Sequence, residues 1–245
     1  MSFGECMSSR RHFLLVLVLI PLNGSMSPPQ DGSQPRGEIR GTVTITPANA
    51  AVENQRGHAM LDRYATDPAA AGSHPVKRDA RPYRISESVT VYLVSKELSQ
   101  ETYVGPSQHG VLDQKGLKFH PQVLPILVGT TVDFPNEDNL FHNVFSYSKP
   151  GEFDLGRYPM GDSRSVTFDH PGVVRVYCDI HSDMNATILV LDNPYFATPD
   201  DDGTFVIPNI PEGTYTLNMW YARDLVLHRS IMIGPADTVK LNLVY

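Results

Sequence analysis

Cys178, His181 and Met184 place a thiol, an imidazole and a thioether at intervals of three residues. A second imidazole, His142, lies well upstream and is followed by Asn143. A cysteine thiolate, two histidines and a weakly bound methionine are the ligands of a trigonal copper site. The residues on both sides of the loop alternate as β-strands do, so one strand would deliver Cys178, a tight loop would present His181 and the returning strand would carry Met184. The spacing therefore predicts one copper ion bound by His142, Cys178, His181 and Met184.

Each of these residues also has a simpler explanation when it is taken alone. A single cysteine in a strand is usually a small buried apolar side chain, and a methionine after a loop usually packs in a core. To replace a metal site, those explanations must all hold at once. They would still leave unexplained the three-residue intervals between Cys178, His181 and Met184 and the upstream histidine. The combination favours a metal site. Tyr177, the residue before the thiol, is expected on the opposite face of its strand and packed in the core.

Other chemistry fits the same residues less well. Structural zinc takes four cysteine or histidine ligands, and methionine is not among them. A cysteine nucleophile with His181 and Asn143 is conceivable, but papain-like sites take their histidine from a distant part of the chain. Binuclear copper sites need two cysteines in the loop, and copper oxidases and nitrite reductases need further histidines, commonly as His-x-His pairs. The remaining histidines form no such pair: they are His12, His58, His74, His109, His120, His170 and His228. One-electron transfer without a bound substrate is what is left, so we do not expect an enzyme.

The first 25 residues have the layout of an export signal. Arg10 and Arg11 precede an apolar run over residues 13–22, which is too short to span a bilayer comfortably. The paired arginines resemble a twin-arginine signal, and an ordinary secretory signal and an uncleaved anchor are the alternatives. We therefore expect a periplasmic protein with no integral membrane span unless the signal stays uncleaved.

Export also gives the cysteine count a meaning. The chain has two cysteines, and Cys6 would leave with the signal. The exported protein would then carry Cys178 as an unpaired thiol in a compartment where thiols oxidise. Binding to a metal would protect it.

The composition limits the class of protein and its partners. A length of 245 residues allows one large or two small domains. Twenty prolines and 18 glycines between short apolar runs favour turns and short strands, and so an all-β protein, over long helices. The formal charge of −7 argues against nucleic acid and anionic membrane surfaces as partners.

Strand and turn patterns divide the chain into five segments. Residues 1–25 are the export signal, 26–36 a flexible leader, 37–108 two strands of an outer sandwich, 109–192 the copper domain, and 193–245 a second sandwich. Within 37–108 the strands are expected at 38–45 and 88–94, with an irregular loop insertion at 48–85, solvated or a docking loop. Four short strands in 193–245 bury too little surface to fold alone. We therefore hypothesise that strands from 37–94 complete this sandwich and that the copper domain is inserted in it.

Several motifs in residues 109–192 resemble the cupredoxins, the small blue copper proteins. They are Leu117 to Pro121, Val128 to Asn136, His142-Asn143-Val144, Pro171-Gly172 and Tyr177 to Met184, in the order of the family pattern. The resemblance implies a Greek-key β-sandwich with His142, Cys178 and His181 as equatorial copper ligands and Met184 as the axial one. The spacing in the ligand loop is the short form, similar to amicyanin and shorter than in plastocyanin. Asn143 would match the family residue whose side chain ties the first-histidine loop to the cysteine loop.

The C-terminal segment resembles a different family. Its Asp-x-x-Gly-x-Phe and Pro-x-Gly-x-Tyr patterns, at 200–205 and 211–215, are similar to the carboxypeptidase regulatory-like sandwich, which has the transthyretin (prealbumin) architecture. Proteins that combine the two are similar to ones labelled methylamine utilisation proteins. The extra sandwich and the insertion at 48–85 set this chain apart from amicyanin and put a methylamine-oxidising partner in doubt.

These observations lead to one principal hypothesis and two alternatives. The principal one is an exported type 1 (blue) copper protein that transfers single electrons between a periplasmic redox donor and acceptor, neither of them identified. The first alternative is a module that binds, buffers or delivers copper. The second is an adhesion or assembly β-sandwich with a vestigial copper site.

Overall fold

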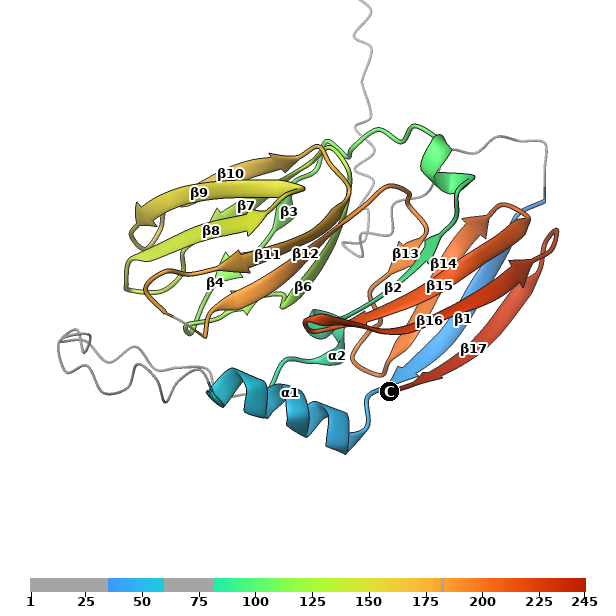
Figure 1. Ribbon diagram of the computed structural model, residues 1–245, viewed down its shortest axis with the longest axis horizontal. Helices are drawn as coiled ribbons and strands as arrows, with labels where there is room; N and C mark the ends of the chain where they lie inside the picture. The colour runs from blue at the N-terminus through green and yellow to red at the C-terminus, as the bar shows by residue number, and fades with distance from the viewer. Residues whose placement is uncertain (1–34, 60–81, 182) are drawn as a thin grey trace, which may run out of the picture.

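The computed structural model describes residues 35–59, 82–181 and 183–245 (Figure 1). The predicted export signal at 1–25, most of the predicted leader at 26–36 and residues 60–81 of the insertion lie outside the described residues. Within the described part the chain is all-β, as predicted, and its strands form two β-sandwiches that lie next to each other (Figure 1). None of the helices in that part is long and apolar enough to cross a membrane.

The first sandwich contains the predicted ligands. Its strands are β3 (Gly110–Val111), β4 (Asp113–Gln114), β5 (Phe119–His120), β6 (Val123–Leu127), β7 (Thr130–Pro135), β8 (His142–Ser148), β9 (Gly151–Tyr158), β10 (Ser163–Phe168), β11 (Gly172–Tyr177) and β12 (Asn185–Leu191). One sheet has the order β6-β12-β11-β8-β9 and the other β10-β7-β3, and β4 and β5 form a separate hairpin. Their inner faces enclose one apolar core, to which Phe134, Val144, Val176 and Ile188 contribute.

The second sandwich is assembled from both ends of the chain. Its strands are β1 (Gly37–Thr44), β2 (Val89–Val94), β13 (Phe196–Ala197), β14 (Thr204–Ile210), β15 (Gly213–Tyr221), β16 (Asp224–Ile233) and β17 (Thr238–Val244). β1 lies between β14, to which it is antiparallel, and β17, to which it is parallel. β2 pairs with β13 and β15. The strands that pair with β1 and β2 thus come from the C-terminal segment. This pairing is the one expected if the second sandwich is discontinuous in sequence.

The insertion begins with a helix, which corrects the expectation of an irregular loop from residue 48. α1 spans Pro47–Ala59. Proline is favoured at the first helical position because its missing N–H has no helical partner there. Alanine, glutamate, glutamine and arginine, which are good helix formers, follow it. A second helix, α2 (Ile85–Ser88), and a short 3-10 helix at Leu98–Gln100 flank β2.

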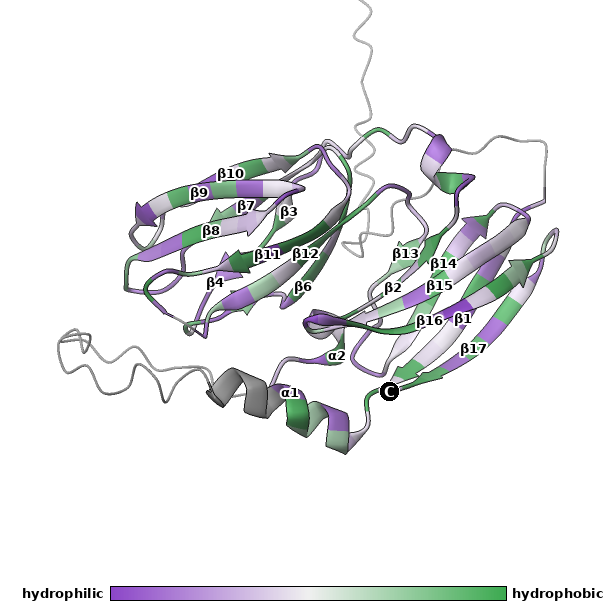
Figure 2. Ribbon diagram, in the orientation of Figure 1, coloured by the Kyte–Doolittle hydropathy of each residue, from purple (hydrophilic) through white to green (hydrophobic). Residues whose placement is uncertain are grey.

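β12 is buried on both faces, which explains its long apolar run. Ile188 and Val190 belong to the core of the first sandwich, whereas Leu189 packs against Val123 and Trp220, where the two sandwiches meet. Figure 2 shows the later part of this strand as hydrophobic, while β17, at the edge of its sheet, alternates between polar and apolar residues. A central strand between two packed layers therefore contains no polar stripe.

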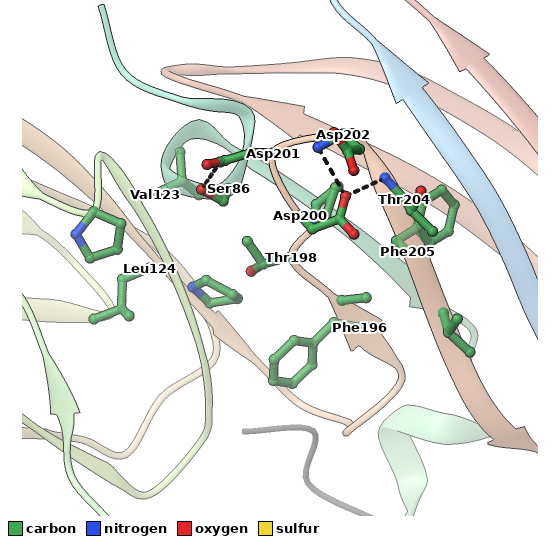
Figure 3. A pocket seen from close by; sticks show the side chains of 15 residues that line it. Ser86, Val123, Leu124, Phe196, Thr198, Asp200, Asp201, Asp202, Thr204 and Phe205 are labelled. Atoms are coloured by element: carbon green, nitrogen blue, oxygen red, sulfur yellow. Dashed lines mark hydrogen bonds between the residues drawn. The ribbon is translucent and has the colours of Figure 1, made fainter. Parts of the chain in front are cut away.

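A cavity of about 910 Å³ opens beside this junction (Figure 3). Apolar side chains of β6 and β13 line one part of it, and the turn at 200–204 lines another. The carboxylate of Asp200 accepts hydrogen bonds from the backbone N–H groups of Asp202 and Thr204, and Ser86 of α2 donates to Asp201 (Figure 3). These hydrogen bonds join residues of the cavity lining to one another. None of the four predicted copper ligands lines the cavity.

Candidate metal centre

The Cys178–Met184 loop is closed by its own backbone. The N–H of Cys178 donates to the carbonyl of Met184 at 3.1 Å, and the N–H of Met184 donates to the carbonyl of His181 at 3.0 Å. β11 ends at Tyr177, directly before the loop, and β12 begins at Asn185, directly after it. β11 also pairs with β8, whose first residue is His142. Strand pairing thus brings the upstream histidine beside the loop.

Three donor atoms converge at this end of the sandwich. The Nδ1 atoms of His142 and His181 lie 3.1 Å apart, and the Cys178 Sγ lies 3.8 Å from the first and 3.7 Å from the second. Metal bonds to imidazole nitrogen and thiolate sulfur measure about 2.0–2.3 Å, so one ion can reach all three atoms. Among the described residues these three form the one such group of His, Cys, Asp and Glu side chains. The donor set fits copper.

Burial differs among the predicted ligands. His142 is 0 % exposed and Cys178 is 4 % exposed, whereas His181 is partly exposed. Met184 is buried in the same apolar core as Cys178. Its place at the base of the loop suits a weak axial contact, and that role stays a prediction. Solvent therefore reaches the group mainly at His181.

The donor atoms change one another's protonation. Burial by itself would raise the pKa of the Cys178 thiol, but hydrogen bonds with His142 and His181 lower it to about 5. Burial would lower the pKa of His142, but hydrogen bonds with Asp138 and Cys178 raise it to about 9. In the metal-free protein at neutral pH the sulfur is therefore a thiolate beside an imidazolium. A thiolate is the form of cysteine that binds metals.

Asp138 is a buried residue of the site that the sequence analysis missed. Its Oδ2 lies 3.0 Å from the Nε2 of His142, the ring nitrogen that faces away from Cys178, and Asp138 is 6 % exposed. Burial raises the pKa of this carboxyl, but the bond with His142 and two backbone N–H groups outweigh that effect and lower it. A carboxylate four residues before a candidate ligand histidine was the available signal.

One expectation about a neighbouring residue, Tyr177 in the core, needs correction, and another stays a prediction. The side-chain amide of Asn143 donates to Asp154 of β9 at 2.7 Å, and its role in tying the two ligand loops together stays a prediction. It is the backbone N–H of Asn143 that contacts the Cys178 sulfur. Tyr177 is 39 % exposed and lies beside Phe145 on the outer face of its sheet, because the inner face is taken by Cys178.

Comparison with known proteins supports a copper domain. Residues 107–191 match the sequence profile of copper binding proteins of the plastocyanin/azurin family, and this segment contains all four predicted ligands. This segment is therefore similar to the copper binding proteins of that family. A search of curated proteins finds no match.

Solved structures with similarity to the chain include three copper proteins. A Cu-containing nitrite reductase (NirK) from Thermus scotoductus SA-01 is 30% identical over 40% of this chain and 27% of its own, with a TM-score of 0.33. A purple cupredoxin from Nitrosopumilus maritimus is 26% identical over 34% of this chain and 99% of its own, with a TM-score of 0.31. A reduced amicyanin variant is 21% identical over 41% of this chain and 98% of its own, with a TM-score of 0.33. The chain thus spans about a quarter of the reductase and nearly all of the two small proteins.

Proposed function

We propose that this protein is an exported type 1 copper protein that carries single electrons between two redox partners in the periplasm. The observation that supports this most directly is the convergence of the His142, His181 and Cys178 donor atoms within 4.8 Å of one another. His142, Cys178 and His181 would hold the ion, and Met184 would supply the weak axial sulfur. Bound copper would supply a centre that changes charge by one electron.

The chain's own residues would keep the site rigid during that change. The loop is closed by backbone hydrogen bonds at both Cys178 and Met184, and β8 and β11 fix the two ends of the donor set. Soft sulfur and imidazole ligands in a trigonal arrangement suit both oxidation states of copper. Little rearrangement would then accompany electron transfer.

The exposed surface around His181 suits brief contact with a partner. Phe141 and Ile180 directly precede the two histidines and are exposed, and Met160 is exposed just after Tyr158, the β9 residue that pairs with His142. Exposed apolar side chains next to the candidate ligands in the chain would exclude water from a transient interface. We propose that redox donor and acceptor dock here.

Visible spectroscopy tests the proposed function. Purified protein is mixed with Cu(II), and its spectrum is recorded before and after reduction with ascorbate. We expect an intense blue absorption that ascorbate bleaches and that Cys178→Ala lacks, because the colour requires the copper–thiolate bond. His109→Ala is the matched control and should keep the colour, because His109 does not belong to the donor group.

Two other results would contradict electron transfer. A colourless protein that binds only Cu(I) would favour copper handling. A protein that binds neither ion would favour an adhesion or assembly role for the sandwiches.

A further inference from the structure

We propose that Asp138 is a positioning residue that fixes the ring of His142 for metal binding and favours Cu(II) over Cu(I). The inference rests on the proposed function, since it concerns the same site. It adds a residue that is not a ligand and that acts through a ligand. Three observations support it: the bond to His142, the way Asp138 is itself held, and its burial.

The bond to Asp138 selects one tautomer of His142. A neutral imidazole has one nitrogen that donates and one that accepts. A carboxylate can only accept, so the contact of 3.0 Å between the Asp138 Oδ2 and the His142 Nε2 requires the proton on Nε2. The proton that leaves the ring when a metal binds must then come from Nδ1, which lies on the side where Cys178 and His181 converge. The tautomer that remains is the one that a metal at the convergence point needs.

Asp138 is held in place by a tight turn between β4 and β5. Its Oδ1 accepts from the N–H of Gly116 at 2.6 Å, and its Oδ2 accepts from the N–H of Leu117 at 2.9 Å. Both turn residues have left-handed backbones, with φ of 62° at Gly116 and 60° at Leu117. Successive N–H groups in such a turn form a concavity for an anion.

The turn carries strain that needs a compensating contact. Leu117 is not a glycine, and a left-handed backbone is unfavourable for a residue with a side chain. Such a conformation persists where the surrounding structure enforces it, often at functional sites. The two hydrogen bonds to Asp138 are contacts that enforce it. The carboxylate therefore connects the turn to His142.

Burial makes the charge of Asp138 effective at the metal. Asp138 and His142 are both buried, so water screens the carboxylate little. A fixed negative charge that is hydrogen-bonded to a ligand makes that ligand a stronger donor. The extra electron density stabilises the ion of higher charge, and the reduction potential falls.

The test compares Asp138→Asn with the wild-type protein, both loaded with copper. The substitution keeps the size of the side chain and removes its charge. Changes of this kind cost about 10–100-fold in metal affinity, and we expect the loss to be larger for Cu(II) than for Cu(I). A tenfold selective loss would raise the midpoint potential by about 59 mV. Redox titration and competition with a Cu(II) chelator measure the two quantities.

Asp133→Asn is the matched control. Asp133 lies on β7 of the same sandwich and also pairs with a histidine, His109, at 3.0 Å, but neither residue belongs to the donor group. This variant should keep the wild-type potential. If both variants bind copper with the same potential as wild type, the inference about Asp138 is wrong and the proposed function stands. If wild type binds no copper, both fail.

A measurement on the wild-type protein covers the case in which Asp138→Asn does not fold. In the Cu(I)-loaded protein, nitrogen-15 NMR should show a proton on the Nε2 of His142 that exchanges slowly with solvent. A proton on Nδ1, or rapid exchange at Nε2, would overturn the inference.

Discussion

The Cys178 sulfur and the His142 ring form a charged pair in the metal-free protein. The pKa of the thiol is about 5 and that of the imidazole about 9. We therefore expect the ultraviolet absorbance of the thiolate to persist in chelator-treated protein until the pH falls to about 5. Cys178→Ser is the reference, since it removes this thiolate. A thiol that titrates near its ordinary value of 9.0 would contradict the prediction.

The same pair makes the stability of the metal-free protein depend on pH. The lowered thiol pKa contributes stability that is present above pH 9.0 and is lost as the pH falls through about 5. The raised imidazole pKa contributes stability that is present below pH 6.5 and is lost as the pH rises through about 9. Between pH 6.5 and 9 the stability contributions of the thiol and the imidazole change in opposite directions. Below pH 6.5 only the thiol contribution still changes, so the thermal midpoint should fall on acidification from pH 6.5 to pH 5. Cys178→Ser should show no such fall.

The contacts of individual residues were predictable where residue type and spacing together match a known set of metal ligands. Cys178, His181 and Met184 share one short loop, so residue type and spacing indicate their convergence. The bond between Asp138 and His142 depends on the path of residues 136–141. That path is set by the buried Asn136, whose side chain donates to the carbonyl of Leu140. The alternation of polar and apolar residues along the sequence does not indicate such a hydrogen bond.

The turn before β14 shows how an element depends on a single backbone position. Gly203 has a φ of 82°, its carbonyl accepts from the N–H of Val43 in β1, and a Cβ added to it would collide with the carbonyl oxygen of Val43. A side chain there would have to push β1 away from the turn. Gly203 is therefore required both by its conformation and by the close approach of another strand.

Gly203→Ala should destabilise the protein more than Gly161→Ala. Gly161 has a similar φ of 87° but no atom within 4 Å of an added Cβ. Its substitution carries the backbone cost alone, about 1–2 kcal/mol. Gly203→Ala adds the cost of a steric clash, a further 1–3 kcal/mol, roughly. Urea unfolding measures both, and equal losses would contradict the close approach of β1.

Elements were easier to predict in type than in extent. The strand at 38–45 matches β1 to within a residue, because period-two alternation is a strong signal on a strand with one buried face. α1 was missed because its residues lack an apolar stripe, and helices are recognised mainly by that stripe. Its alanines and its initial proline were weaker signals in a segment that otherwise resembles a loop.

The two sandwiches are joined through the tip of the β15–β16 hairpin. Trp220 packs against Val123 and Leu189 of the first sandwich, and its Nε1 donates to the carbonyl of Ala222 at 3.0 Å. The guanidinium of Arg175 on β11 lies 5.2 Å from the centre of the Trp220 ring and donates to the carbonyl of Arg223. β11 thus leads to the Cys178–Met184 loop at one end and contacts the second sandwich along its length.

Trp220→Ala should weaken the coupling between the sandwiches. Removal of a buried tryptophan costs about 3–5 kcal/mol, and here the loss falls on the contact between two cores. We expect calorimetry to show two separate transitions in place of a single one. Trp220→Phe keeps the apolar contact and should lose about 1 kcal/mol, mainly from the hydrogen bond. One transition at the wild-type temperature in Trp220→Ala would contradict this role.

The arrangement of β1 has a consequence for the order in which the chain folds during synthesis. β1 emerges from the ribosome early, but both strands that pair with it, β14 and β17, come from the C-terminal segment. Until they are made, its apolar residues Ile39 and Val43 have no sheet to join. The first sandwich, in contrast, consists of strands that are consecutive in the chain, so its contacts close over shorter loops and are expected to form sooner. We therefore expect the first sandwich to fold before β1 has a pairing strand, and a chain that ends before β17 to keep an open, aggregation-prone edge on β1.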